Sequence, residues 1–128
     1  MGYRSEVVLV VGKEVMPQFM VTMAKSSEAR ALCFANHDKM IKDYEEEGNI
    51  LFAWNGIKWY EGYEAIDALT DFMDWCDSES VPHPDPEDGG TVDGDECYRF
   101  CRVGEEEDDN VTRGSAFWDV GISRSIEF

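Results

Sequence analysis

The stretch from Ile50 to Cys76 constrains the fold more than any other part of the sequence. It begins with an apolar run, typical of a buried strand, and then passes into a segment whose apolar residues recur every three or four positions. The second pattern is that of an amphipathic helix with one apolar side. The apolar stripe consists of Ile66, Leu69, Phe72, Met73 and Cys76. We therefore expect a helix that packs on a sheet, and with it a mixed α+β fold.

The other side of the same helix is acidic. Its carboxylates are spaced by three, four and three residues, which places them along one exposed ridge, and no lysine or arginine lies between them in the sequence. The ridge consists of Glu64, Asp67, Asp71 and Asp74, and Asp77 follows three residues later. This ridge is the feature of the sequence that most suggests a function.

The whole chain is unusually acidic for its length. Its 128 residues hold 28 acidic and 11 basic side chains, so the formal net charge is −17 at pH 7. Seven phenylalanines and four tryptophans still provide the material for a core, so we expect a single folded domain over residues 1–128. A charge of this sign repels nucleic acid and anionic membranes. The expected partners are therefore basic protein surfaces or cations.

The N-terminal region and the cysteines both favour a cytoplasmic protein. The first 15 residues contain an apolar run of only five and no cationic leader, so we expect neither a signal peptide nor a membrane span. The four cysteines lie in apolar or strand-like segments, which predicts buried free thiols in a reducing compartment rather than disulfides. They are Cys33, Cys76, Cys97 and Cys101.

The segments before Ile50 read as strand, helix and strand. Residues 6–11 predict a central strand that is buried on both faces, because the run is almost wholly aliphatic. Residues 13–34 predict helix, with Pro17 acceptable in its first turn, and the two serines at 26 and 27 leave open whether there is one helix or two. For 39–46 we prefer strand to helix, because the Gly48-Asn49 pair favours a hairpin turn.

The segments after Cys76 read as loop, strand and strand. Residues 78–96 are acidic and rich in proline and glycine, which predicts a long loop, and residues 97–103 predict a strand. The clearest period of two in the chain lies at its C-terminal end, although Arg124 interrupts the apolar face. That face consists of Trp118, Val120, Ile122, Ile126 and Phe128. The order of elements predicts a ferredoxin-like (split βαβ) antiparallel sheet with an extra C-terminal strand and with helices on one face.

A second acidic run lies between the last two predicted strands. Phosphates advance about 3.4 Å per nucleotide along one DNA strand, whereas carboxylates three or four residues apart on a helix advance roughly 4.5 to 6 Å. Two such rows on one domain would approximate the charge pattern of a nucleic acid; the ordinary alternative is that both are solvated surfaces. The candidate partner-binding residues are Glu64, Asp67, Asp71, Asp74, Asp77, Glu105, Glu106, Glu107, Asp108 and Asp109.

Metal-binding and catalytic motifs are weak or missing in the sequence. Residues 85–96 resemble a calcium loop, but Gly89 supplies no side-chain oxygen and prolines precede the loop where a helix should enter. Cys97 and Cys101 lack the spacing of a zinc site. The aromatic residues around Trp54 and Trp59 suit a core cluster better than a stacking platform. We therefore expect no metal, no cofactor and no enzyme activity, and we prefer a plain acidic loop to a calcium site.

Four segments carry a resemblance to a group of known proteins. GYRSEV, ILFAWNGIKWYEGYEAIDAL, YRFCRVGEEEDDN and ISRSIEF occur in this order over most of the chain. They resemble small acidic proteins encoded by tailed phages and prophages. The resemblance implies a similar fold and a gene product that acts inside an infected bacterium.

Charge and resemblance together lead to one hypothesis and two alternatives. The hypothesis is a phage anti-defence protein, of the anti-CRISPR or anti-restriction type, that blocks a host nucleic-acid-binding complex through its acidic surface. The first alternative is a structural, assembly or self-associating phage protein, since the exposed edges of a small sheet invite pairing. The second is a small enzyme or nucleotide binder, for which the sequence contains no motif.

Overall fold

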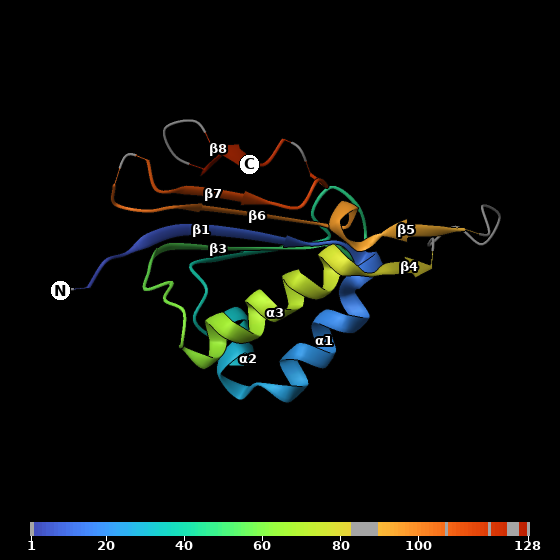
Figure 1. The fold of residues 1–128 in the computed structure, drawn as a ribbon, viewed down its shortest axis with the longest axis horizontal. Helices are drawn as coiled ribbons and strands as arrows, with labels where there is room; N and C mark the ends of the chain where they lie inside the picture. Colours follow the sequence, from blue (N-terminus) through green and yellow to red (C-terminus); the bar gives the residue numbers. More distant parts are fainter. Residues whose placement is uncertain (1, 83–89, 107, 118, 123–125, 128) are drawn as a thin grey trace.

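A five-stranded antiparallel sheet with three α-helices on one face forms the fold, so the mixed α+β prediction is confirmed (Figure 1). The computed structural model describes residues 2–82, 90–106, 108–117, 119–122 and 126–127. The strand order is β2-β3-β1-β6-β7, and each neighbouring pair is antiparallel. The strands are β1 (Ser5–Val11), β2 (Lys39–Lys42), β3 (Ile50–Ile57), β6 (Tyr98–Val103) and β7 (Asn110–Arg113). The helices are α1 (Met16–Lys25), α2 (Ser27–Phe34) and α3 (Glu64–Ser78).

The central strand β1 is buried on both faces, as its aliphatic run predicts. It pairs with β3 on one side and with β6 on the other. Val7, Leu9 and Val11 face the helices, while Val8 and Val10 face the opposite side of the sheet, and all five are at most 1% exposed. A strand buried on both faces needs apolar side chains at every position, which is why β1 lacks a period of two.

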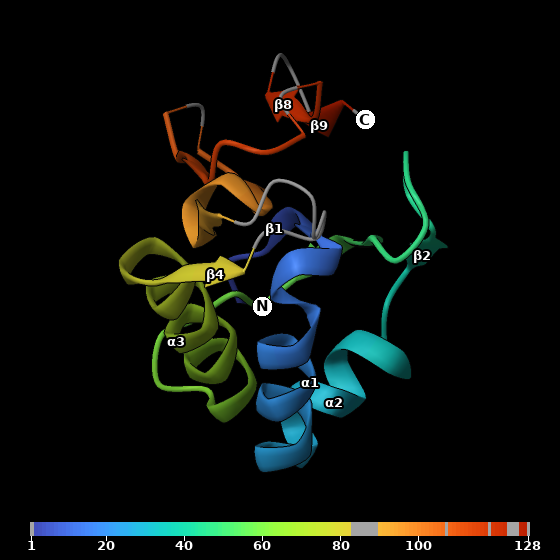
Figure 2. The same cartoon turned by 90° about the vertical axis from the view of Figure 1, so that its right-hand side faces the viewer.

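The helical face holds the larger core. All five residues of the predicted apolar stripe of α3 are buried, and four of them, Leu69, Phe72, Met73 and Cys76, belong to this core. The ring of Phe19 in α1 meets the ring of Phe72 edge-on, with 5.3 Å between their centroids. The end-on view shows the three helices gathered beneath one side of the sheet (Figure 2). The prediction of helices on one face is confirmed.

The boundary between α1 and α2 resolves the question that the two serines left open. Ser26 has extended backbone, is buried, and accepts a hydrogen bond from the Ala29 N–H at 3.1 Å. This side chain is the N-cap of α2, so the segment forms two helices. A short 3₁₀ turn, Lys13–Val15, precedes α1, and Pro17 lies in the first turn of α1, where its missing N–H costs no hydrogen bond.

The C-terminal segment does not form the long strand that its period of two predicts. It folds into two short strands, β8 (Gly121–Ile122) and β9 (Ile126–Glu127), and within the described residues these two strands pair only with each other. Its apolar residues cover the second face of the sheet, where Val120 and Ile126 are buried. Trp118, Arg124 and Phe128 lie outside the described residues.

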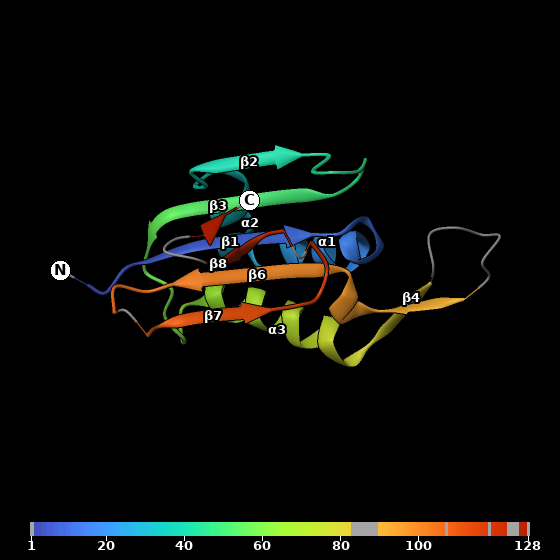
Figure 3. The ribbon, with the colours of Figure 1, turned by 90° about the horizontal axis from the view of Figure 1, so that it is seen from above.

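The edge strand beyond β6 is β7, and the C-terminal strands β8 and β9 are not part of the main sheet (Figure 3). The period of two therefore indicates that this segment packs against a face of the sheet, not that it forms a strand of that sheet.

The predicted loop at 78–96 is partly structured. It contains a small hairpin of β4 (Ser80–Pro82) and β5 (Thr91–Asp93), followed by a 3₁₀ turn at Gly94–Glu96, while residues 83–89 lie outside the described part. Val81 is buried against the main core, which anchors the hairpin. A side chain at Gly94 would collide with the Cys76 carbonyl, so glycine is required where the turn crosses the end of α3.

Candidate functional site

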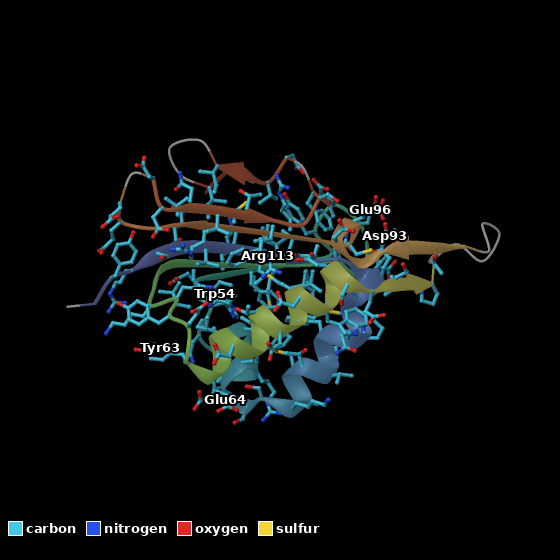
Figure 4. The ribbon with its side chains drawn as sticks, in the orientation of Figure 1. Trp54, Tyr63, Glu64, Asp93, Glu96 and Arg113 are labelled. Atoms are coloured by element: carbon cyan, nitrogen blue, oxygen red, sulfur yellow. The ribbon has the colours of Figure 1, made fainter. Side chains whose placement is uncertain are left out.

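The first half of α3 presents three exposed carboxylates. Glu64, Asp67 and Asp71 all lie on the exposed side of the helix, and in the described part of the chain none forms an ion pair. Asp67 also accepts a hydrogen bond from the Gly62 N–H at 3.0 Å, which ties the helix to the preceding turn. Figure 4 shows Glu64 at the end of α3 that lies farthest from the sheet. Negative charge in the first turn is favoured by the partial positive charge of the helix N-terminus.

The second half of the ridge is partly neutralised by an arginine that the sequence pattern of α3 cannot reveal. The Arg113 guanidinium, on β7, donates to Asp74 Oδ1 at 2.8 Å and to Asp77 Oδ2 at 2.7 Å. The Tyr98 hydroxyl donates to Asp77 as well, at 2.8 Å. Burial opposes the charge of Arg113, but its hydrogen bonds to Asp77 and Asp74 outweigh burial and raise its pKa.

The two halves of the ridge therefore differ in what they offer to a partner. The side chains of Asp74 and Asp77 remain 62% and 41% exposed. Their two negative charges exceed the single positive charge of Arg113 by one. The five carboxylates of the ridge and the one guanidinium leave four negative charges uncompensated. Most of that charge lies in the three unpaired residues of the first half.

One residue of the second acidic row has a structural role. Asp109 forms a bidentate ion pair with Arg102, at 2.7 and 3.0 Å, and accepts a hydrogen bond from the Tyr3 hydroxyl at 2.7 Å. The hydrogen bonds from Arg102 and then Tyr3 lower the pKa of Asp109 to about 2. Tyr3 also accepts a hydrogen bond from the Glu106 N–H, so this network joins the N-terminal segment to the turn. No local signal predicts it, because Tyr3 and Asp109 are 106 residues apart.

The rest of the second row lies in the turn between β6 and β7. Glu105, Glu106 and Asp108 are exposed there, and Glu107 lies outside the described residues. The turn ends directly before the first residue of β7, while the last residue of β7 is Arg113, which holds Asp74 and Asp77. The two acidic rows thus approach the two ends of the same edge strand (Figure 3).

A groove runs between α3 and this edge of the sheet. Its volume is about 420 Å³, and its lining mixes apolar with charged side chains. Apolar residues from the helix and the sheet meet there with both arginines of the ion pairs. The lining includes Trp59, Met73, Phe100, Val111, Arg102 and Arg113. The acidic surface therefore borders a groove that is partly apolar.

A third acidic group, which sequence reasoning missed, lies between the β2–β3 loop and the 3₁₀ turn at Gly94–Glu96. The neighbouring carboxyl group of Asp119, together with burial and charge repulsion, raises the pKa of Glu45. Glu45 lines a pocket of about 280 Å³ together with Glu14, Glu46 and Glu96. Lys13 pairs with Glu46 at 2.9 Å. These residues come from separate segments, so no spacing in the sequence points to them. In the described part of the chain no group of three or more such side chains is arranged to hold a metal ion.

The weaker motifs of the sequence have ordinary places in the fold. Residues 85–89 of the calcium-like loop lie outside the described residues, and of the rest Thr91–Asp93 forms strand β5. All four cysteines are buried and free, as predicted, and burial raises the pKa of Cys33, Cys76 and Cys97 to about 12. Trp54 is a core residue whose indole N–H donates to the Leu32 carbonyl at 3.2 Å.

Comparison with known proteins adds no further constraint on these sites. No family model, no curated protein and no solved structure matches the chain. Among the helices of the described residues, none combines the length and the apolar character needed to cross a membrane.

Proposed function

We propose that this protein is an inhibitor that occupies the basic, nucleic-acid-binding surface of a host protein or complex. The observation that carries the proposal is the unpaired first half of the α3 ridge on a domain with a net charge of −17. Within the described structure no lysine or arginine neutralises Glu64, Asp67 or Asp71. Their charge is therefore available to cations of a partner.

Electrostatics explains why such a surface competes with nucleic acid. A basic groove binds DNA or RNA largely because cationic side chains replace the counterions of the phosphates. Carboxylates held on a rigid helix neutralise the same cations without the duplex. Complementary charge also raises the rate of association, and this rate falls as salt is added. Together with the phage resemblance, this supports an anti-defence role, of the anti-CRISPR or anti-restriction type, in the cytoplasm of an infected bacterium.

Reversing charges on the ridge tests the proposal. A tagged protein is used to retain partners from nuclease-treated bacterial lysate at low and at moderate salt, and the affinity of each purified partner is then measured. We expect Glu64→Lys with Asp71→Lys to weaken that affinity about tenfold, equal to about 1.4 kcal/mol. Neither side chain makes a hydrogen bond in the described structure, so the fold should tolerate both changes.

The matched control changes the same charge on the opposite side of the molecule. Glu45→Lys with Glu47→Lys alters the net charge equally, but both residues lie in the loop between β2 and β3. We expect this variant to bind the partner within about twofold of the unchanged protein. Equal losses in both variants would mean that only total charge matters, and an unchanged affinity of the ridge variant would refute the proposal.

We also infer that the fold is a ferredoxin-like (split βαβ) arrangement with β7 appended. The order of strand β1, helices, strands β2 and β3, helix α3 and strand β6 supports this inference. So does the position of β1 between β3 and β6. In such an arrangement the appended β7 extends the sheet beyond the helices and leaves an edge beside α3.

A further inference from the structure

The two edges of the main sheet differ in how they are protected against pairing. Edge strand β2 carries exposed lysines at both of its ends, Lys39 and Lys42, and lysine is a common device against edge-to-edge association. Edge strand β7 carries no lysine, and its one cation, Arg113, is already bound to Asp74 and Asp77. The β7 edge is therefore the one left open.

The hydrogen-bond pattern shows which main-chain groups of β7 face outward. The Gly104 N–H donates to the Asp109 carbonyl at 2.7 Å, which makes these two residues a hydrogen-bonded pair. Because such pairs alternate along an antiparallel ladder, the main chains of Val111 and Arg113 face β6. The N–H and C=O of Thr112 then point away from β6, and no other described strand lies beside them. Thr112 is exposed.

The surroundings of this edge indicate the charge of an incoming segment. Asp74 and Asp77 share the single guanidinium of Arg113 and remain well exposed, so one further cation would balance the cluster. Directly opposed side chains on neighbouring strands lie about 4.5–5.5 Å apart. A lysine or arginine placed beside Arg113 on a new strand would therefore reach both carboxylates. The exposed acids Glu105, Glu106 and Asp108 flank the other end of β7.

We propose that β7 is the docking edge for an extended segment of the partner, which joins the sheet as a sixth strand and presents lysine or arginine toward α3. This rests on the proposed function in taking the partner to be basic. Main-chain hydrogen bonds with Thr112 supply affinity, and alternate side chains supply specificity. Side chains on the helix side enter the groove lined by Met73, Phe100 and Val111.

Charge also argues against a second copy of this chain as the occupant. Two copies would bring together two domains of −17, and the acidic turn before β7 would approach the same strand of the other copy. Repulsion of this kind opposes self-association, whereas a basic segment is attracted. The partner is thus a cationic strand of a different protein.

A synthetic peptide that alternates lysine with threonine serves as the probe. We expect it to bind the full-length protein in fluorescence polarisation, and we expect hydrogen exchange of the Thr112 amide, followed by NMR, to slow at least tenfold at saturation. Thr112→Pro removes the outward N–H without changing charge, and proline is tolerated on edge strands. It should weaken peptide binding about tenfold, since a net hydrogen bond is worth roughly 0.5–1.5 kcal/mol. Thr112→Val, which keeps the N–H, should bind within about twofold.

A modified peptide keeps the test independent of how well the proline variant folds. Methylation of alternate backbone nitrogens leaves the charge intact and blocks strand pairing, so binding to the unmodified protein should fall about tenfold. Equal binding of both peptides, together with unchanged exchange at Thr112, would overturn the strand-addition proposal. Protection of Thr112 that grows with protein concentration alone, with a dimer in sedimentation, would assign the edge to a second copy and overturn it too.

The same set of variants separates this proposal from the proposed function. If the host partner loses affinity with Glu64→Lys and Asp71→Lys but not with Thr112→Pro, the acidic surface inhibits without strand addition. If the ridge variant leaves the host partner unaffected while Thr112→Pro still weakens the peptide, the edge binds basic strands but the inhibitory role of the ridge is refuted.

Discussion

Two arginines at one side of the sheet, Arg102 and Arg113, determine which carboxylates are available to a partner. Arg102 holds Asp109 together with Tyr3, and Arg113 holds Asp74 and Asp77. The carboxylate of Asp109 is thus part of the fold, and its replacement tests stability and not binding. The sequence alone groups all of these acids as candidate binding residues, because it cannot show which carboxylates the two arginines contact.

The lowered pKa of Asp109 predicts a pH dependence of stability. An aspartate in an unfolded chain has a pKa of about 4, whereas the hydrogen bonds from Arg102 and Tyr3 lower that of Asp109 to about 2 in the fold. The ionised side chain therefore stabilises the fold above about pH 4, and this contribution is lost as the pH falls toward 2. We expect the difference in unfolding free energy between the unchanged protein and Asp109→Asn to shrink over this range. Urea unfolding at several pH values measures it, and a constant difference would contradict the role of Asp109.

At the scale of elements, local sequence patterns predicted whether a segment is helix or strand more reliably than they predicted which strands pair in the sheet. The apolar stripe predicted that α3 is a helix. The two serines left open whether α1 and α2 are separate, and the cap formed by Ser26 shows that they are. Strand β7 escaped prediction because its four residues have no clear period and follow directly on an acidic turn. It exists as a strand because β6 supplies its hydrogen bonds.

The cap of α2 gives a prediction with a built-in control. Ser26→Ala removes the acceptor of the Ala29 N–H, so the free energy of unfolding should fall by about 1 kcal/mol. Ser27→Ala changes an exposed neighbour that caps nothing and should stay within about 0.5 kcal/mol of the unchanged protein. Urea unfolding of both variants measures the difference. Equal effects would show that Ser26 does not act as the cap.

For the whole molecule, repulsion among the many acidic side chains lowers the stability of the fold. The chain has 28 acidic side chains against 11 basic ones, so most of its acids have no cation of their own. Among the described residues, Lys13, Arg102 and Arg113 form ion pairs with carboxylates. Repulsion among the remainder opposes the compact state. The raised pKa of Glu45 beside the carboxyl group of Asp119 is a local example of this crowding.

This repulsion predicts that salt stabilises the protein. Added sodium chloride shortens the screening length to about 8 Å near 0.15 M, so distant like charges interact less and the melting temperature should rise. The Glu45→Lys with Glu47→Lys variant carries less negative charge and should show a smaller rise. Thermal unfolding followed by circular dichroism over a range of salt concentrations tests both statements. A melting temperature that falls with salt would mean that the ion pairs outweigh the repulsion.

Sequence alone determined the properties that depend on neighbours within a turn or a strand. These include the amphipathic α3 with its row of carboxylates, the doubly buried β1, the α+β class and the buried free thiols. Only the tertiary structure decided which carboxylates are paired, which strand forms the open edge, and that the C-terminal segment covers the sheet without joining it. The reason is physical: helix and strand periods repeat over a few residues, whereas the ion pair of Arg113 with Asp77 joins residues 36 apart. Such pairs form only after the chain has folded, so the distribution of charge on the surface is a product of the whole fold.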